Sequence, residues 1–268
     1  MPDYEDINDP LIYIPKYFKV LSKGDSEGVS DLVPMVLWPA QKHYIQNRTH
    51  RDICVKSRQQ GFSTGVMADN AHRLFTIPYQ RASIITHDQE TSEFLFQTVQ
   101  RFHRNLPPDK RPITDWKSGS RMRFPKLDSY IYIDSAKSDN LGIGHTLNIA
   151  HLSEVGKWPS RKADELYADI SQTVPAGGFI TIESTPKGRG GLFYRLYDAA
   201  KKGDINYISG ATDDNSTSID NINNIIVNQI YPDINYISGI TSGLTNGGSN
   251  FIDKTYAQLY AMVTGSTL

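Results

Sequence analysis

The sequence has few of the features that mark secreted or membrane proteins. Its single cysteine, Cys54, excludes an internal disulfide, which fits a reducing compartment. A run of about 18 apolar residues, the length of a membrane-spanning helix, is missing. The N-terminal segment MPDYEDINDPLIYIPKY is acidic and lacks the long apolar centre of a signal peptide. We therefore expect a soluble protein that is not secreted and has no membrane partner.

The chain also lacks an overall charge excess. Its 28 lysines and arginines and 29 acids give a net charge of -1, so total charge provides no argument for a nucleic-acid partner. The charges are unevenly distributed, because only Lys254 among the lysines and arginines lies beyond residue 203. Residues 1–203 carry about +4 and residues 204–268 about -5. A modestly basic body is compatible with a polyanionic substrate without requiring one.

Strand and helix signals alternate along most of the chain. Apolar strand patterns occur at 52–55, 81–86, 121–124, 130–133, 147–152 and 179–183. Helical patterns follow Pro39 and occupy about 64–75, 89–105, 164–172 and 191–201. This alternation predicts an α/β fold with a parallel sheet flanked by helices.

The composition changes at about Asp204, where Asn, Ser, Thr, Gly and Ile become frequent. The heptapeptide DINYISG occurs at 204–210 and again at 233–239. Two copies are too few to bury the core of a stacked solenoid, so a weakly ordered polar tail is expected. The predicted organisation is a lead-in at 1–34, an α/β domain at 35–203 and a tail at 204–268.

The segment after the strand at 52–55 has the order of a phosphate-binding loop. A strand, a polar loop with a glycine and a helix follow one another, as in the pattern G-x-x-x-x-G-K-[ST]. Gly61 fills the second glycine position, and Ser63 fills the hydroxyl position, whose oxygen can bind Mg²⁺. Backbone N–H groups at the start of the helix would bind phosphate oxygens. The predicted nucleotide-binding residues of this loop are Lys56, Ser57, Arg58, Gln59, Gln60, Gly61, Phe62, Ser63 and Thr64.

The loop lacks the lysine of that pattern, because Phe62 stands in its place. The chemistry requires a cation at the phosphates rather than a cation at one sequence position. Lys56 opens the loop, and its flexible ammonium group could reach back to the same phosphates. Arg58 is a second candidate, with a guanidinium fork suited to phosphate oxygens. For the loop alone, an ordinary polar strand-to-helix turn is the alternative.

A candidate catalytic carboxylate follows the strand at 147–152. ATP hydrolysis needs a group that orients the attacking water, at the carboxyl end of a strand beside the phosphate loop. Glu154 fits this role, and a surface glutamate at a strand end is the alternative. Many P-loop ATPases have an aspartate before this glutamate, but here Ser153 precedes it. A serine can hydrogen-bond a magnesium-bound water, although it brings no charge.

Two further segments agree with a nucleotide site. The strand at 179–183 runs into S-T-P-x-G, where Ser184 and Thr185 could hydrogen-bond a phosphate or the attacking water. Such a segment is also ordinary turn chemistry. Upstream of the loop, Gln41 in Trp-Pro-Ala-Gln could contact the edge of a purine, or could simply begin a helix.

In this order, the segments resemble the large terminase subunits of tailed phages, over about residues 35–203. K-S-x-x-x-G-[aromatic]-S is similar to a terminase loop whose lysine has moved to its front, and R-Q-x-G-x-[ST]-T to the commoner form. HLSEVGKW, with Trp158, looks like a Ser-Glu variant of the catalytic strand, and S-T-P-x-G resembles the coupling motif. The segment Leu141–Thr146 departs from the family, because Ile143 stands where relatives often carry a basic residue.

The resemblance implies a P-loop ATPase domain at 35–203 that uses ATP and Mg²⁺ to move double-stranded DNA into a procapsid. It implies catalytic or phosphate-binding roles for Glu154, Lys56 and Arg58, an adenine contact for Gln41, coupling by Ser184 and Thr185, and metal binding by Ser63 and, through water, Ser153. It also implies a small terminase subunit, a portal and a homo-oligomeric ring as partners, in the cytoplasm of an infected bacterium.

By this resemblance, a full-length large terminase has two domains, with an RNase H-like nuclease domain after the ATPase domain. The 65 residues of the tail contain six aspartates and neither glutamate nor histidine, so no nuclease activity is expected. Two alternatives to the packaging motor remain at this point. One is a helicase-like, nucleic-acid-dependent ATPase, and the other is a truncated, non-catalytic terminase fragment.

Overall fold

The structure is a computed structural model that describes residues 7–22, 24, 28–58, 60–138, 145–203 and 205–210. All of these residues belong to one compact unit, Met1–Asp214. The predicted tail beyond residue 210, with the second DINYISG copy, lies outside the described residues. Across the described ranges, each helix is too short or too polar to cross a membrane.

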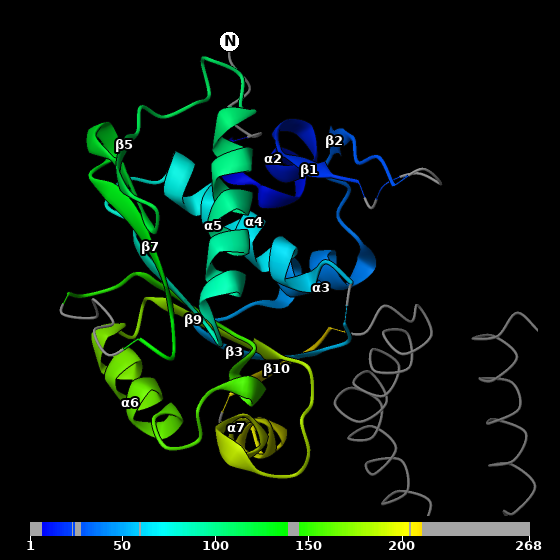
Figure 1. The fold of residues 1–268 in the computed structure, drawn as a ribbon, viewed down its shortest axis with the longest axis vertical. Coiled ribbons are helices and arrows are strands. Elements are labelled where there is room, and N and C mark those ends of the chain that lie inside the picture. Colours follow the sequence, from blue (N-terminus) through cyan, green and yellow to red (C-terminus); the bar gives the residue numbers. More distant parts are fainter. Residues whose placement is uncertain are drawn as a thin grey trace, which may run out of the picture. The chain divides into compact units, whose positions relative to one another are not determined.

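A mixed β-sheet forms the centre of this unit (Figure 1). Within the described residues it contains eight strands in the order β10-β3-β9-β8-β4-β7-β6-β5. Neighbouring strands from β10 to β7 are parallel, whereas β7, β6 and β5 are antiparallel to one another. The bounds are β3 (Arg51–Lys56), β4 (Arg81–Thr86), β5 (Asp115–Ser118), β6 (Arg121–Phe124), β7 (Ser129–Ser135), β8 (Ile149–Ser153), β9 (Phe179–Ser184) and β10 (Asn206–Gly210).

Helices cover the two faces of the sheet and bury a separate core on each. One face carries α2 (Pro10–Tyr17), α3 (Pro39–Asn47), α4 (Phe62–Thr76) and α5 (Gln89–Arg104), and the other carries α6 (Ala163–Thr173) and α7 (Gly191–Lys201) (Figure 1). Side chains alternate between faces along each strand. Ile84 of β4 therefore joins the core beneath α2, α3, α4 and α5, which we call the first core. The next residue, Ile85, joins the second core, beneath α6 and α7. The predicted α/β class with a mainly parallel sheet flanked by helices is confirmed.

Two segments extend this unit beyond the limits expected from sequence. The lead-in forms α2 and a short hairpin of β1 (Lys19–Leu21) and β2 (Leu32–Pro34). Its Phe18 ring stacks on Phe102 of α5, with 4.5 Å between ring centroids, so the lead-in is part of the first core. At the other end, β10 pairs in parallel with β3, although it falls within the predicted tail. The three-part division of the whole chain stays a prediction.

Strict alternation of strands and helices fails at one edge of the sheet. β5, β6 and β7 follow one another without an α-helix between them and form an antiparallel meander. In β6 the residues alternate, with Met122 and Phe124 buried and Arg121 and Arg123 exposed. One face of this meander thus packs on the core while the other carries charged side chains, as antiparallel sheets allow.

Candidate functional site

The predicted phosphate loop lies between the end of β3 and the start of α4. Gly61, just before α4, has a φ of 64°, in the left-handed region that glycine adopts without strain. The side chain of Gln41 fixes this junction, because its Nε2 donates to the carbonyl oxygen of Gly61 at 2.7 Å. Its Oε1 accepts a hydrogen bond from the backbone N–H of Trp38 at 2.9 Å. Gln41 therefore lies beside the loop, while its adenine contact stays a prediction.

Phe62 explains why the lysine of the usual pattern is missing from its position. Its side chain is 2% exposed and packs in the first core, with its ring 5.7 Å from that of Tyr44 in an edge-on arrangement. A lysine there would bury an ammonium group in an apolar core, which is costly without a partner. Only the backbone of Phe62 can face a ligand at the loop.

Lys56, the lysine predicted to bind phosphates, lies between two carboxylates at the end of β3. Its Nζ lies 2.7 Å from Glu154 Oε1 and 3.1 Å from Glu183 Oε2. These residues come from the carboxyl ends of the parallel strands β3, β8 and β9, which lie side by side in the sheet. The displaced lysine and the predicted catalytic glutamate, distant in sequence, are thus brought into direct contact.

Glu154 begins the turn that follows β8, in the left-handed conformation with a φ of 55°. Its Oε2 accepts a hydrogen bond from Thr185 Oγ1 at 3.1 Å and lies 3.1 Å from Lys157 Nζ. Thr185, predicted to couple hydrolysis to movement, therefore touches the candidate catalytic carboxylate. A non-glycine residue in this backbone region costs free energy, and such strain often accompanies functional sites.

Ser184 joins the ends of β8 and β9. Its side chain is fully buried, and its Oγ accepts a hydrogen bond from the backbone N–H of Gly156 at 3.1 Å. The same hydroxyl donates to the carbonyl oxygen of Thr185 at 2.9 Å. A Cβ at Gly156 would lie 2.9 Å from this Oγ, so glycine is required for the close approach. The turn that carries Glu154 is therefore tied to the S-T-P segment by the hydroxyls of both Ser184 and Thr185.

Glu183 also belongs to this cluster, although the sequence reasoning did not single it out. Its carboxylate is fully buried, and Oε1 accepts hydrogen bonds from Ser63 Oγ at 2.9 Å and Ser153 Oγ at 2.6 Å. His151 Nε2 lies 3.4 Å from the same oxygen. Glu183 stands directly before Ser184 at the end of a predicted strand, and that position was the available signal.

The charges of the cluster stabilise one another. Burial alone would raise the pKa of Glu183, but the neighbouring His151, Lys56 and Ser153 outweigh it and lower the pKa to about 2. For Glu154, burial also opposes ionisation, yet the hydrogen bond and charge of Lys56 lower its pKa. Burial favours a neutral Lys56, but the two carboxylates raise its pKa above the ordinary value. Both glutamates are therefore ionised and Lys56 is protonated at neutral pH.

The remaining predicted loop residues differ in their exposure. Ser57 and Arg58 are exposed, and Arg58 makes no ion pair within the described residues. Gln60 and Thr64 are half-buried at the start of α4. Gln59 and the segment 141–144, with Ile143, lie outside the described residues. The structure thus brings together Lys56, Ser63, Ser153, Glu154 and Thr185, and leaves Arg58 at the surface of the loop.

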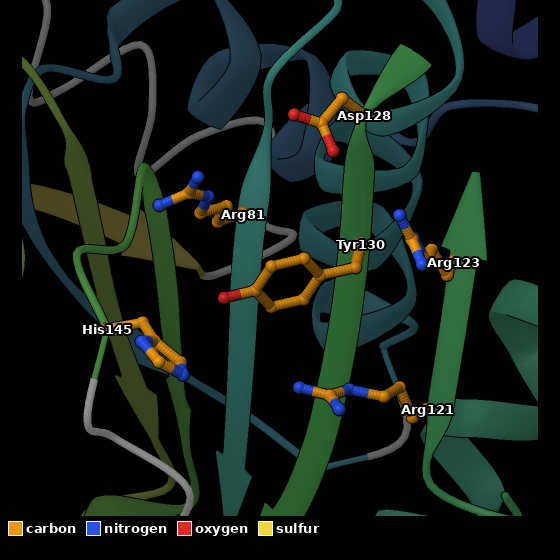
Figure 2. A pocket seen from close by; sticks show the side chains of 6 residues that line it. All are labelled: Arg81, Arg121, Arg123, Asp128, Tyr130 and His145. Carbon is orange, nitrogen blue, oxygen red and sulfur yellow. The ribbon is translucent and has the colours of Figure 1, made fainter. Parts of the chain in front are cut away.

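A second feature lies on the charged face of β4, β6 and β7. Figure 2 shows Tyr130 in the middle of a shallow pocket, with the guanidinium groups of Arg81, Arg121 and Arg123 around it. The pocket has a volume of about 320 Å³ and is also lined by Asp128 and His145. Arg121 Cζ lies 5.3 Å from the centroid of the Tyr130 ring. We call Arg81, Arg121, Arg123, Tyr130 and His145 the arginine patch.

The arginine patch is accessible because α6 and α7 cover only part of their face of the sheet. The apolar residues that pack against these helices come from β3, β4, β8 and β9, and not from β6 or β7. In the described part of the chain, the three guanidinium groups form no ion pair with a carboxylate. Arg81 and Tyr130 stand near the amino ends of their strands. The patch is therefore at the opposite end of the parallel strands from the Lys56 cluster.

The loop runs from a parallel strand to a helix, in the order of a phosphate-binding loop, and carboxylates from neighbouring strand ends lie beside it. Among solved structures, the chain is similar to the large terminase of bacteriophage HK97, with a TM-score of 0.60 and 17% identity over 78% of this chain and 43% of that one. It is also similar to the large terminase of the thermophilic bacteriophage D6E, with a TM-score of 0.53 and 15% identity over 68% and 47% of the two chains. A D6E structure in complex with ATP-γ-S matches with a TM-score of 0.50 and 14% identity, over 67% of this chain and 46% of that one.

These matches confirm the predicted resemblance to phage large terminases at the level of fold. The chain spans less than half the length of the terminases it matches. No protein-family model matches the chain, and a search of curated proteins finds no match either.

Proposed function

We propose that this chain contains the ATP-hydrolysing motor of a viral DNA-packaging terminase, which moves double-stranded DNA into a procapsid. The observation that carries the proposal is the 2.7 Å contact between Lys56 Nζ and Glu154 Oε1. Ser63, the predicted Mg²⁺ ligand, is joined to the same cluster through Glu183. A cation, a carboxylate and a hydroxyl from separate segments thus converge where α/β sheets bind their ligands, at the carboxyl ends of the strands.

The proposed chemistry is mainly electrostatic. Lys56 binds the phosphates of ATP, and Ser63 offers its hydroxyl to Mg²⁺, which neutralises charge on the phosphate oxygens. Glu154 orients the attacking water, because it is ionised and held at the strand end. Thr185, bonded to Glu154, connects this carboxylate to the S-T-P segment and so to α7. Fixed charges of this kind stabilise a transition state without needing to reorganise.

The test is Mg²⁺-dependent ATP hydrolysis by the full chain. Lys56→Ala should lower kcat by about 100-fold or more, since one preorganised electrostatic contact typically contributes that much. Lys137→Ala, which removes an exposed lysine outside the cluster, is the matched control and should retain full turnover. Full turnover in Lys56→Ala with loss in Arg58→Ala would assign the phosphate cation to Arg58 instead.

The alternatives give different outcomes in the same system. A helicase-like ATPase would unwind duplex DNA, and a non-catalytic fragment would bind neither ATP nor Mg²⁺ in a calorimetric titration. A packaging motor should instead hydrolyse ATP faster when the small terminase subunit or the portal is added. Assembly of the chain into a ring on the portal, inside an infected bacterium, belongs to the same proposal.

The arginine patch supports double-stranded DNA as the substrate. Exposed guanidinium groups without a carboxylate partner are suited to phosphate oxygens. Their position away from the Lys56 cluster would let DNA and ATP bind at the same time. Sequence-independent phosphate contacts are what a translocating motor needs, because they hold any DNA sequence equally.

The DNA part of the proposal is tested by fluorescence anisotropy with duplex DNA over a range of salt concentrations. The double variant Arg121→Ala/Arg123→Ala should weaken binding, and the slope of log K against log salt should fall by about 1 per lost phosphate contact. Arg195→Ala is the matched control, because Arg195 is exposed but already paired with Asp164. An unchanged slope in the double variant would show that DNA binds elsewhere.

A further inference from the structure

Ser153 leaves a charge missing from the site. In the aligned position, many P-loop ATPases have an aspartate behind the Mg²⁺ shell, whereas a serine offers only a neutral hydroxyl. Mg²⁺ prefers oxygen ligands and usually keeps several waters, which carboxylates then hydrogen-bond. Ser63 and Ser153, the two residues assigned to the metal, bring no negative charge to it.

The strand pairing places the carboxylic acid of Glu183 beside Ser153. β9 lies between β3 and β8 in the sheet, and Glu183 is paired in register with Ser153 on one side and Cys54 on the other. The Glu183 side chain is thereby held between the strand that carries Lys56 and the strand that carries Glu154.

One oxygen of Glu183 connects the two serines assigned to the metal. Oε1 accepts from Ser63 Oγ at 2.9 Å and from Ser153 Oγ at 2.6 Å. Within the described residues, Oε2 makes no hydrogen bond and has only the ion pair with Lys56 Nζ at 3.1 Å. This buried oxygen can therefore accept a hydrogen bond from a metal-bound water once Lys56 turns to an anion.

Burial of a carboxylate on a central strand has no benefit for packing. Moving such a charge out of water costs several kcal/mol, and an apolar side chain at the same place is often as stable or more so. Buried ionised groups beside a cleft are therefore candidates for function. The donors around Glu183 are the groups expected at a phosphate and metal site, which fits a role toward a cation.

We propose that Glu183 supplies the negative charge for the divalent cation, in place of the acid that Ser153 does not provide. The inference rests on the proposed ATPase function and adds a positioning residue to it. Glu183 acts through the cation's bound water and through Ser63, while Glu154 keeps the role of orienting the attacking water. The metal-binding and water-orienting carboxylates thus come from neighbouring strands rather than from consecutive residues.

The experiment measures Mn²⁺ binding to the full chain by electron paramagnetic resonance, with a non-hydrolysable ATP analogue present. Glu183→Gln should weaken Mn²⁺ binding about 10- to 100-fold, the usual effect of losing a group that orients metal ligands. Affinity for the analogue without metal should change less. Glu154→Gln is the matched control, which should abolish hydrolysis and leave Mn²⁺ affinity within a few-fold of wild type.

A variant that moves the carboxylate from one strand to its neighbour gives the most specific test. In Ser153→Asp/Glu183→Gln the carboxylate moves from β9 to β8, and Mn²⁺ affinity should return toward the wild-type value. A purely structural role of Glu183 would not be rescued in this way. Glu183→Asp keeps a carboxylate on β9 and should therefore bind Mn²⁺ more tightly than Glu183→Gln, which provides a second test of the charge.

Failure of this inference and failure of the proposed function are distinguishable. If wild type binds the analogue and Mn²⁺, but Glu183→Gln binds Mn²⁺ equally well or Ser153→Asp/Glu183→Gln fails to recover it, the role of Glu183 is wrong and the ATPase proposal stands. If wild type binds neither the analogue nor Mn²⁺, the ATPase proposal is wrong and the inference is wrong with it.

Discussion

Replacing Lys56 by methionine would leave the carboxylates of Glu154 and Glu183 without the cation they share. The Glu183 side chain is 0% exposed and that of Lys56 only 10%, and their charged atoms are 3.1 Å apart. Removing one partner of a buried ion pair costs about 3–5 kcal/mol, because the other charge stays buried and uncompensated. Since domains unfold with about 5–15 kcal/mol, we expect Lys56→Met to lose a large share of its stability.

The assay is urea unfolding at pH 7, followed by far-UV circular dichroism. Lys56→Met/Glu183→Gln should recover much of the lost stability, because the glutamine removes the fully buried charge and Glu154 keeps its ion pair with Lys157. Lys202→Met, which breaks an exposed ion pair with Asp198, should have little effect and serves as the control. If the costs of Lys56→Met and Glu183→Gln add to within about 0.5 kcal/mol, the two residues do not interact as described and the electrostatic account is refuted.

Three further predictions follow from individual contacts. The pKa of Glu183 is lowered from 4.5 to about 2, so the stability that its ionised form gives to the fold is full above pH 4.5 and is lost as the pH falls toward 2. In an acid titration followed by circular dichroism, the signal of the folded state should therefore fall less steeply for Glu183→Gln than for wild type. A Cβ at Gly65 would lie 2.7 Å from Gln41 Cγ, so Gly65→Ala should cost about 1–3 kcal/mol in urea unfolding, and less when Gln41 is also replaced by alanine. Phe62→Lys would restore the usual loop pattern but bury a charge, so thermal melts should find it less stable than Phe62→Leu, and it should not rescue ATP hydrolysis in Lys56→Ala.

Of the described strands of the sheet, the sequence predicted all except β5 and β10, because their periodicity is local. The strands at 81–86 and 179–183 and the helix at 89–105 appear in the structure within a residue or two of their expected bounds. α2 was missed because its segment also contains Pro15 and reads as a polar lead-in, although Tyr13 and Ile14 are buried. β10 was missed because its residues belong to a repeat in the tail, and only pairing with β3 makes them part of the sheet.

The sequence identified those candidate residues whose chemistry is indicated by a single segment of the chain. Lys56 and Glu154 each follow a recognisable strand, and their contact confirms that these strand ends lie together. Glu183 was missed because its importance depends on register, which sets it beside Ser153 on the neighbouring strand. Strand order and register are fixed by packing across the whole sheet, so no local pattern reports them.

Because Lys56 is shared by two carboxylates, the binding of an anion and the binding of a cation at this cluster affect each other. An anion that takes Lys56 must release both carboxylates, and a cation that takes a carboxylate must release Lys56. Each ligand thereby removes a competitor of the other, so the two bind with positive cooperativity. Thermodynamic linkage makes this effect equal in both directions. The cluster would therefore favour joint occupation by an anion and a divalent cation over occupation by either one alone.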